Sequence, residues 1–134
     1  MSNAEARFTY PTGDAATSLT VVDTTTSLEW LRKPLAGRYE HQQAIDACEA
    51  VALVGGGFRL PTRAELLTLV DITKFDPAID TEAFPDIKGG WFWTSDLCAW
   101  SSASAWYVYF DYGGVVSYHR YGSGFALAVR RVGQ

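Results

Sequence analysis

The stretch that most constrains the fold of this chain is residues 55–66, which reverses the chain and then starts a helix. Its three consecutive glycines accept backbone angles that other residues resist, so they end the element before them. Thr62 and Glu65 follow with the spacing of a capping box, in which each side chain satisfies a free backbone N–H at a helix start. We therefore predict a structural corner and a helix over residues 63–70, with Arg59 pairing with an inner carboxylate or a carbonyl group.

Hydrophobic periodicity predicts an α+β chain. An apolar face recurs at helical spacing over residues 40–53, whereas residues 71–90 are irregular and rich in acids, Pro and Gly. Residues 1–18 are small and polar, so we expect a flexible lead-in, with a possible tag remnant at 1–4, before a single domain over 19–134. The other segments favour short antiparallel strands at residues 19–23, 28–31, 91–94, 106–110, 115–118 and 126–132, with a small-residue loop over 95–104.

The composition allows a hydrophobic core and narrows the kinds of partner. The 134 residues are 48% hydrophobic and 19% charged, and the net charge of -4 argues against a general nucleic-acid binder. No apolar run approaches the length of a membrane span, so we expect no membrane insertion. We expect a cell-surface, periplasmic or secreted location if a signal peptide has been trimmed, and a cytoplasmic one otherwise.

The sequence shows no pattern typical of a catalytic, metal or cofactor site. Cys48 and Cys98 leave open one disulfide bond or two free thiols, and no His or Lys stands near Cys98 to activate it. His41 and His119 lack metal-ligand spacing, and we expect His41 on the surface of the first helix. The acids of the irregular region fit no calcium-loop motif and are expected to be solvated or to cap helix ends: Asp71, Asp76, Asp80 and Asp86.

Aromatic residues are the better functional signal. Twelve of the 19 lie within residues 91–125. Together with Ser, Gly, Asp, His and Arg they resemble the composition of adaptable binding surfaces, although strand propensity alone also places aromatic residues in a sheet. Alternation assigns Trp93, Trp106, Val108 and Phe110 to the core and leaves Trp91 and Phe92 undecided. The predicted ligand contacts are Trp100, Tyr107, Tyr109, Asp111, Tyr112, Tyr118, His119, Arg120 and Tyr121.

Six motifs lie in order along the chain from residue 19 onward. The most specific is Arg59-Leu60-Pro61-Thr62, followed by Glu65-Leu66, Leu69 and Val70-Asp71. The others are Val22-Asp23 with Leu28-Glu29-Trp30, Ala44 with Cys48-Glu49, Phe84-Pro85 with Phe92-Trp93-Thr94-Ser95, residues 105–113, and Val129-Arg130-Arg131-Val132. Together they resemble a bacterial domain family of unknown function, typified by the C-terminal domain of the Legionella collagen-like adhesin and related to the variable proteins of diversity-generating retroelements.

This resemblance implies a C-type lectin-like fold, in which the first and last strands pair, two helices pack on small antiparallel sheets, and a long irregular region builds a binding surface. The chain departs from the family at Arg131, where a cysteine is common, and at Phe58, where tryptophan is usual. The family disulfide bond is therefore expected to be absent, which makes Cys48 a buried free thiol. Arg130 is expected to form a structural ion pair, with a ligand contact as the less favoured alternative.

We therefore expect a non-catalytic, adhesin-like module that contacts a protein or polysaccharide through its C-terminal face. In a sharper version it is a retroelement-diversified variable protein, because residues 117–123 hold the types that mutated asparagine codons yield. Two alternatives stay open. One is an oxidoreductase like the formylglycine-generating enzymes, which share the fold class and need a redox-active cysteine pair. The other is a structural domain of a trimeric surface fibre.

Overall fold

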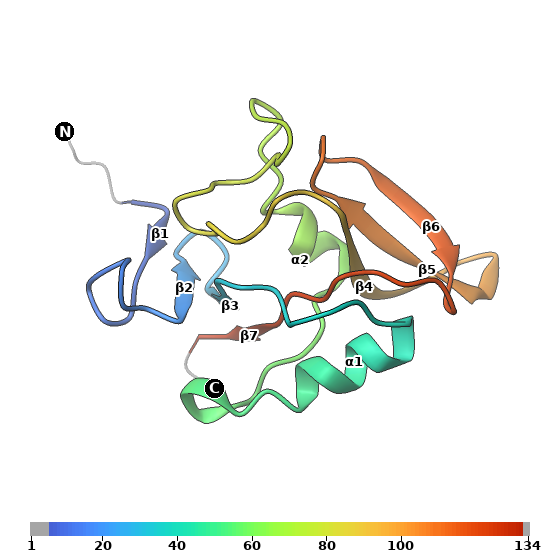
Figure 1. The fold of residues 1–134 in the computed structure, drawn as a ribbon, viewed down its shortest axis with the longest axis horizontal. Coiled ribbons are helices and arrows are strands. Elements are labelled where there is room, and N and C mark those ends of the chain that lie inside the picture. Colours follow the sequence, from blue (N-terminus) through green and yellow to red (C-terminus); the bar gives the residue numbers. More distant parts are fainter. Residues whose placement is uncertain (1–5, 133–134) are drawn as a thin grey trace.

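The computed structural model describes residues 6–132, which form an α+β architecture of two small antiparallel sheets and two short α-helices (Figure 1). The sheets have the strand orders β1-β2-β3-β7 and β4-β5-β6. The elements are β1 (Phe8–Thr9), β2 (Thr20–Asp23), β3 (Leu28–Leu31), α1 (His41–Glu49), a 3-10 turn (Leu53–Gly55), α2 (Arg63–Leu67), β4 (Trp91–Cys98), β5 (Ser101–Tyr109), β6 (Val115–His119) and β7 (Val129–Arg131). The predicted α+β class is confirmed.

The first sheet joins the two ends of the described chain. β2 and β3 form a hairpin, with Ser27 in a left-handed conformation at its turn (φ 59°). β3 also pairs with β7, which places Glu29 opposite Arg130, and their side chains form an ion pair at 3.0 Å. The resemblance implies that the first and last strands pair. In the structure the last strand, β7, pairs with β3, the second strand of the hairpin, while β1 pairs with β2.

The N-terminal segment adds a strand where the sequence predicts only a lead-in. β1 pairs with β2, and Arg7 just before it reaches the buried carboxylate of Asp23 at 2.8 Å. The Arg7 guanidinium also donates to the carbonyl of Thr68 at the end of α2. A two-residue strand is too short to show the alternation from which strands are predicted. The expected tag remnant at residues 1–4 lies outside the described part of the chain.

The second sheet is larger than predicted, because residues 95–98 and 101–104 of the expected small-residue loop belong to β4 and β5 instead. Its β4 and β5 strands meet at a tight turn, where Cys98 stands opposite Ser101. The register shifts between Trp93 and Leu97, and an irregularity of this kind lets one strand take up extra residues without ending the ladder. Ser and Ala are weak strand formers, so the sequence alone favours a loop here.

Both helices begin with a capping box and both are shorter than predicted. At α2, the Glu65 N–H donates to Thr62 Oγ1 at 3.1 Å and the Thr62 N–H donates to the Glu65 carboxylate at 2.9 Å, as predicted. At α1, Glu40 and Gln43 form the same reciprocal arrangement. Helix α1 ends at Glu49, and the chain then forms the 3-10 turn at Leu53–Gly55, ahead of Gly56 and Gly57.

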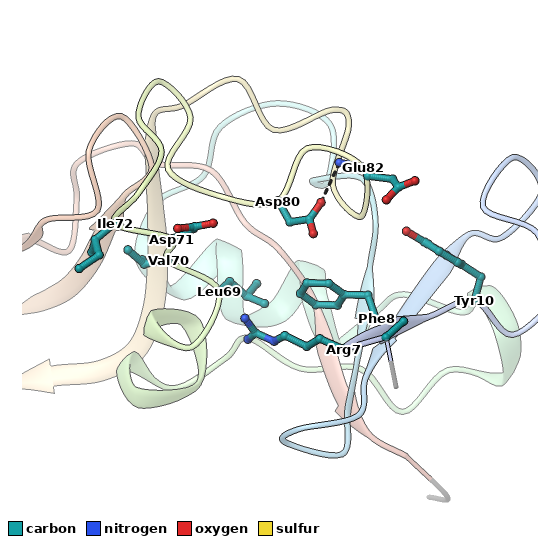
Figure 2. A pocket seen from close by; sticks show the side chains of 10 residues that line it. Arg7, Phe8, Tyr10, Leu69, Val70, Asp71, Ile72, Asp80 and Glu82 are labelled. Carbon is teal, nitrogen blue, oxygen red and sulfur yellow. Dashed lines mark hydrogen bonds between the residues drawn. The ribbon is translucent and has the colours of Figure 1, made fainter. Parts of the chain in front are cut away.

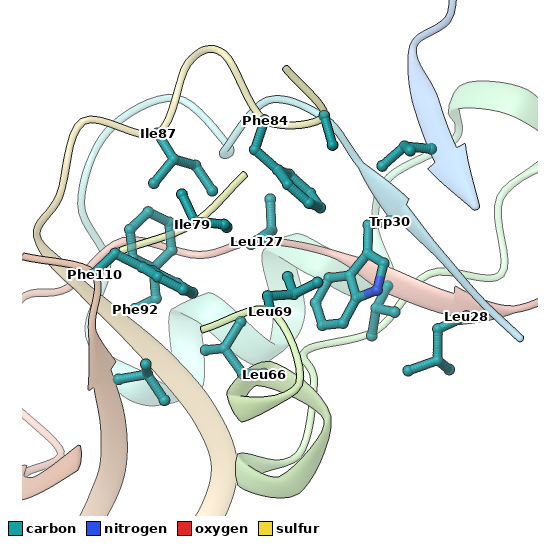
Figure 3. Packing of buried hydrophobic residues seen from close by; sticks show 14 residues of the cluster. Leu28, Trp30, Leu66, Leu69, Ile79, Phe84, Ile87, Phe92, Phe110 and Leu127 are labelled. Carbon is teal, nitrogen blue, oxygen red and sulfur yellow. The ribbon is translucent and has the colours of Figure 1, made fainter. Parts of the chain in front are cut away.

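Two hydrophobic clusters fill the space between these elements. The first, shown in Figure 3, joins both sheets, α2 and the long loop, and includes Trp30, Leu66, Phe84, Phe92, Phe110 and Leu127. The second lies around α1 and the second sheet and includes Cys48, Phe58, Trp93, Tyr107 and Ala126. The loop between α2 and β4 buries Ile79, Phe84 and Ile87, so it is held by its own packing.

Both cysteines are buried free thiols, which confirms the expectation for Cys48 and places Cys98 at the end of a strand rather than in a loop. Among residues 6–132, neither helix has the length and apolar character that crossing a bilayer requires.

We expect Thr62→Ala to lower the free energy of unfolding by about 1 kcal/mol, because the Glu65 N–H loses its acceptor. Urea unfolding followed by tryptophan fluorescence measures this change. Thr25→Ala is the matched control, since Thr25 is exposed in the β2–β3 turn, and it should change the same free energy by less than about 0.5 kcal/mol. Equal effects of the two substitutions would contradict the capping role.

Candidate binding surface

Five aromatic rings gather on one face of the second sheet. The strand register places Trp91 opposite Tyr109 and puts Tyr107 and Tyr118 on the same face. Trp91 stacks on Tyr107 with ring centroids 4.9 Å apart, and Tyr112 stacks on Tyr109 at 5.6 Å. Tyr118 stands edge-on to Trp91 at 5.8 Å. We call these five residues the aromatic face.

The aromatic face is buried at its centre and open at its rim. Tyr107 is only 4% exposed, whereas Tyr112 and Tyr118 are 67% and 39% exposed. Trp91 and Tyr109 are half-buried between them. Because the inner rings cover one another, a partner would meet chiefly the rim rings and the hydroxyl groups.

The electrostatics of the aromatic face are those of clustered phenol groups. Burial raises the pKa of Tyr107 to about 12, and the neighbouring Tyr109, Tyr118 and Tyr112 act in the same direction. Tyr107 is therefore neutral near pH 7. Since a phenol hydroxyl both donates and accepts, the face offers uncharged hydrogen-bonding groups in apolar surroundings.

The structure corrects the sequence-based assignments within this sheet. Tyr107, predicted to be an exposed contact, is the buried floor of the aromatic face. Trp106, assigned to the core, is half-buried and carries the Arg63 guanidinium 4.6 Å from its ring centroid. Trp91, left undecided by alternation, contacts three of the other rings. Alternation assumes one buried face, but β5 is packed on both faces, with Val108 in one cluster and Tyr107 in the other.

Three further predicted contacts lie where β6 ends beside the start of α1. His119 is exposed, and its ring is 4.2 Å from that of Tyr118. Arg120 and the exposed Tyr121 line a hollow of about 310 Å³ together with Glu40, Gln42 and Ala103. His119 thus contacts the aromatic face through Tyr118, and Arg120 and Tyr121 line the neighbouring hollow.

His41, expected on the helix surface, is 1% exposed because it connects α1 to the second sheet. Its Nε2 bonds to the carbonyl of Thr94 at 2.8 Å, and its Nδ1 faces Arg120 Nε at 3.0 Å. A guanidinium can only donate, so Nδ1 is unprotonated and the ring is the neutral tautomer with its hydrogen on Nε2. Burial, and to a smaller degree the Arg120 charge, lower the pKa of His41. Arg120, a predicted ligand contact, is therefore partly committed to holding the fold.

The two remaining predicted contacts stand apart from the aromatic face. Trp100 is 75% exposed at the β4–β5 turn and packs edge-on against Trp106. Asp111 accepts a hydrogen bond from the Gly90 N–H at 2.9 Å. Its carboxylate lies so close to Gly89, which has a φ of 107°, that a Cβ there would clash with it. Asp111 therefore supports the glycine turn, and its assignment as a ligand contact stays a prediction.

The residues assigned structural roles have their partners within the fold. Arg59 donates to both Glu65 oxygens at 2.7 Å, and these bonds hold the pKa of Glu65 below its usual value. Arg130 and Glu29 form an ion pair in which each side chain is only 10% exposed. Trp93 is buried as predicted. Arg59, in the most specific of the six motifs, and Arg130 thus hold the scaffold together.

A separate cavity of about 670 Å³ lies between β1 and the loop that follows α2. Figure 2 shows Phe8 and Tyr10 on its strand side and Asp80 and Glu82 on its loop side. Two of the residues that line the cavity have partners within the fold. The Asp80 carboxylate accepts a hydrogen bond from the backbone N–H of Glu82 at 2.9 Å, and Arg7 forms an ion pair with Asp23. None of the nine predicted ligand contacts lines this cavity.

The described residues contain no group of three His, Cys, Asp or Glu side chains placed to hold a metal ion. Burial, with a smaller contribution from Glu49, raises the pKa of the Cys48 thiol to about 12. Cys48 is therefore a protonated core residue near neutral pH. The arrangement of the aromatic face offers contact surface and hydrogen-bonding hydroxyl groups.

We expect stability to fall as the pH drops below the ordinary His41 pKa of 6.5. The folded chain keeps this ring neutral while the unfolded chain binds a proton, so protonation stabilises the unfolded state in that window. Above pH 6.5 the full contribution of the neutral His41 ring to the free energy of unfolding is present. Asp23 and Glu65 have lowered pKa values and begin to act only below their ordinary values of 3.8 and 4.5. Urea unfolding between about pH 7 and about pH 5 therefore isolates His41.

The matched pair of variants is His41→Gln and His119→Gln, the chain having two histidines. The slope of unfolding free energy against pH should flatten in His41→Gln, because glutamine does not titrate. It should persist in His119→Gln, since His119 is exposed on β6. A wild-type slope in His41→Gln would contradict the assignment.

The Lcl C-terminal domain family model matches residues 19–130 of this chain. No match was found among curated proteins. The matched region runs from the start of the β2–β3 hairpin through both helices, the long loop and the whole second sheet into β7. It includes every residue of the aromatic face and the ion pair between Glu29 and Arg130. The chain belongs to the Lcl C-terminal domain family.

Proposed function

We propose that this domain is a non-catalytic, adhesin-like binding module whose aromatic face contacts a protein or glycan partner. The observation that carries the proposal is the aromatic face itself, an uncharged cluster of five rings with a buried floor and an exposed rim. Membership in the Lcl C-terminal domain family supports the adhesin-related part. Rigid rings with a polar tip supply contact area at a small cost in conformational entropy.

Tyr112 argues against the simpler explanation that these aromatics serve strand formation alone. It lies in the turn between β5 and β6, where strand propensity does not act. It is nevertheless held in place, because its ring stacks on Tyr109 and approaches Gly114 so closely that a Cβ there would lie 3.1 Å from it. An exposed ring fixed in this way is suited to contact with a partner.

The rest of the proposal follows from the resemblance and the surface chemistry. We place the module on the cell surface or among secreted or periplasmic proteins, with the C-type lectin-like fold that the resemblance implies. In its finer form the proposal includes diversification of residues 117–123, where Tyr118, His119 and Tyr121 are exposed. The genome tests this part: a reverse transcriptase gene and a template repeat beside the gene for this chain would support diversification, and their absence would contradict it.

We expect Tyr112→Ser and Tyr118→Ser each to weaken partner binding about tenfold or more, because both rings stand at the exposed rim of the aromatic face. The partner is first identified with the purified domain on a glycan array and on an array of extracellular proteins. Affinities of the variants are then measured by surface plasmon resonance against that partner.

Phe75→Ser is the matched control, because Phe75 is an aromatic residue 81% exposed on the loop after α2 and takes no part in the aromatic face. It should leave the affinity unchanged. The proposal fails if neither array yields a specific ligand, or if both tyrosine variants bind as the wild type does.

The oxidoreductase alternative requires reactive thiols, and both cysteines are buried. We expect neither to react with the thiol reagent DTNB in the native protein at neutral pH, and both to react once the chain is unfolded in urea. Rapid native labelling that disappears in Cys98→Ser would reopen the alternative.

A further inference from the structure

β6 is the outermost strand of the second sheet, and Figure 1 shows no strand on its outer side. Its pairing with β5 is bracketed by two bonds in the same register: Tyr109 N–H to Gly114 carbonyl and Arg120 N–H to Ala103 carbonyl. In an antiparallel ladder only alternate residues bond to the neighbour. The backbone N–H and carbonyl groups of residues 114, 116, 118 and 120 therefore point toward β5.

The backbone groups of Val115, Ser117 and His119 consequently point away from the sheet. Among the described residues, one of these outward groups has a backbone partner: the carbonyl of His119 accepts a hydrogen bond from the Gly122 N–H at 3.0 Å. A row of such donors and acceptors is a template for another strand.

The fold covers its other long edges. Along β4, the Phe125 N–H donates to the Trp91 carbonyl at 2.7 Å and the Trp93 N–H to the Phe125 carbonyl at 3.0 Å. Along β7, Arg59 and Val129 exchange both backbone bonds at 2.9 and 3.0 Å. The β1 edge is two residues long. Within residues 6–132, β6 is thus the long strand whose outer edge is left open.

The composition of β6 also lacks the usual protection of an open edge. Proteins block such edges with charged side chains, proline or bulges. β6 reads Val-Val-Ser-Tyr-His, without proline, lysine or acid, and its pairing with β5 has no register shift. Val116 and Tyr118 are about two-fifths exposed on the same side as the aromatic face.

We propose that β6 pairs antiparallel with β6 of a second copy of this chain, which joins the two second sheets into one across a two-fold axis. A register centred on Ser117 places Ser117 opposite Ser117 and Val115 opposite His119 of the other copy. The His119 carbonyl, which accepts from the Gly122 N–H, then accepts a second bond with its other lone pair. On the aromatic side, Tyr118 then lies opposite Val116, an aromatic–β-branched pair that stabilises antiparallel strands.

The strand is complementary to itself in charge as well as in hydrogen bonding. The nearest charged side chain on the chain, Arg120, follows the strand and would stand opposite Gly114 of the second copy, so no like charges meet. The pairing also brings two aromatic faces onto one continuous surface. Self-association does not depend on the proposed ligand binding, and its test needs no ligand.

Sedimentation equilibrium tests the proposal directly. The wild type should shift with increasing concentration from 14.7 kDa toward about twice that mass. Ser117→Pro should remain a monomer, because proline removes an outward N–H without touching the bonds to β5. Ser117→Lys should also dissociate the pair, since two ammonium groups would face each other at its centre. Ser117→Thr, which keeps the N–H and the neutral side chain, should associate like the wild type.

Amide hydrogen exchange gives a residue-level readout that a merely unfolded variant cannot imitate. Raising the protein concentration should slow exchange at the amides of Val115 and Ser117, whereas those of Val116 and Tyr118 are protected by β5 at any concentration. A monomer at all concentrations, a trimer, or a dimer that survives in both Ser117→Pro and Ser117→Lys would overturn the proposal.

Discussion

The ion pair between Glu29 and Arg130 is the contact on which the rest of the scaffold depends. It links residues from opposite ends of the chain across β3 and β7, at a separation of 3.0 Å and with both side chains nearly buried. The same guanidinium donates to the carbonyl of Gly56 and lies over the Phe58 ring at 4.4 Å. One side chain therefore fastens the closing strand to the N-terminal hairpin and to the glycine corner. Removing either partner would leave a charge in a site that water scarcely reaches, which is far more costly than losing an exposed pair.

The second sheet is attached to this scaffold by the returning chain rather than by a strand shared between the sheets. Tyr39 and Gly124 exchange backbone bonds, and Trp93 donates its ring N–H to the carbonyl of Tyr39. His41 adds the bridge from α1 to β4 and to Arg120. These contacts cover the β4 side of the sheet, whereas the rim of the aromatic face at Tyr112 and Tyr118 and, within residues 6–132, the β6 edge are left open.

Several features could be predicted because their causes are local. The capping box at Thr62 and Glu65 needs only two residues three positions apart, and it forms as predicted. The structural roles of Arg59 and Arg130 and the free thiol of Cys48 also agree with the structure. Predictions failed where the deciding contact comes from a distant segment. His41 is buried by Thr94 and Arg120, and β1 is held by Asp23 and Thr68.

The sequence by itself determined the α+β class, the corner, the family resemblance and the concentration of aromatic residues toward the C-terminal part of the chain. Periodicity and capping are properties of neighbouring residues, and they survive any arrangement of the rest. Only the tertiary structure decided which rings meet. Trp91 and Tyr118 are 27 positions apart and touch because two strand registers bring them together. It also decided that Asp111 supports a glycine turn, and that β6 is left at an open edge, because burial depends on what the remainder of the chain covers.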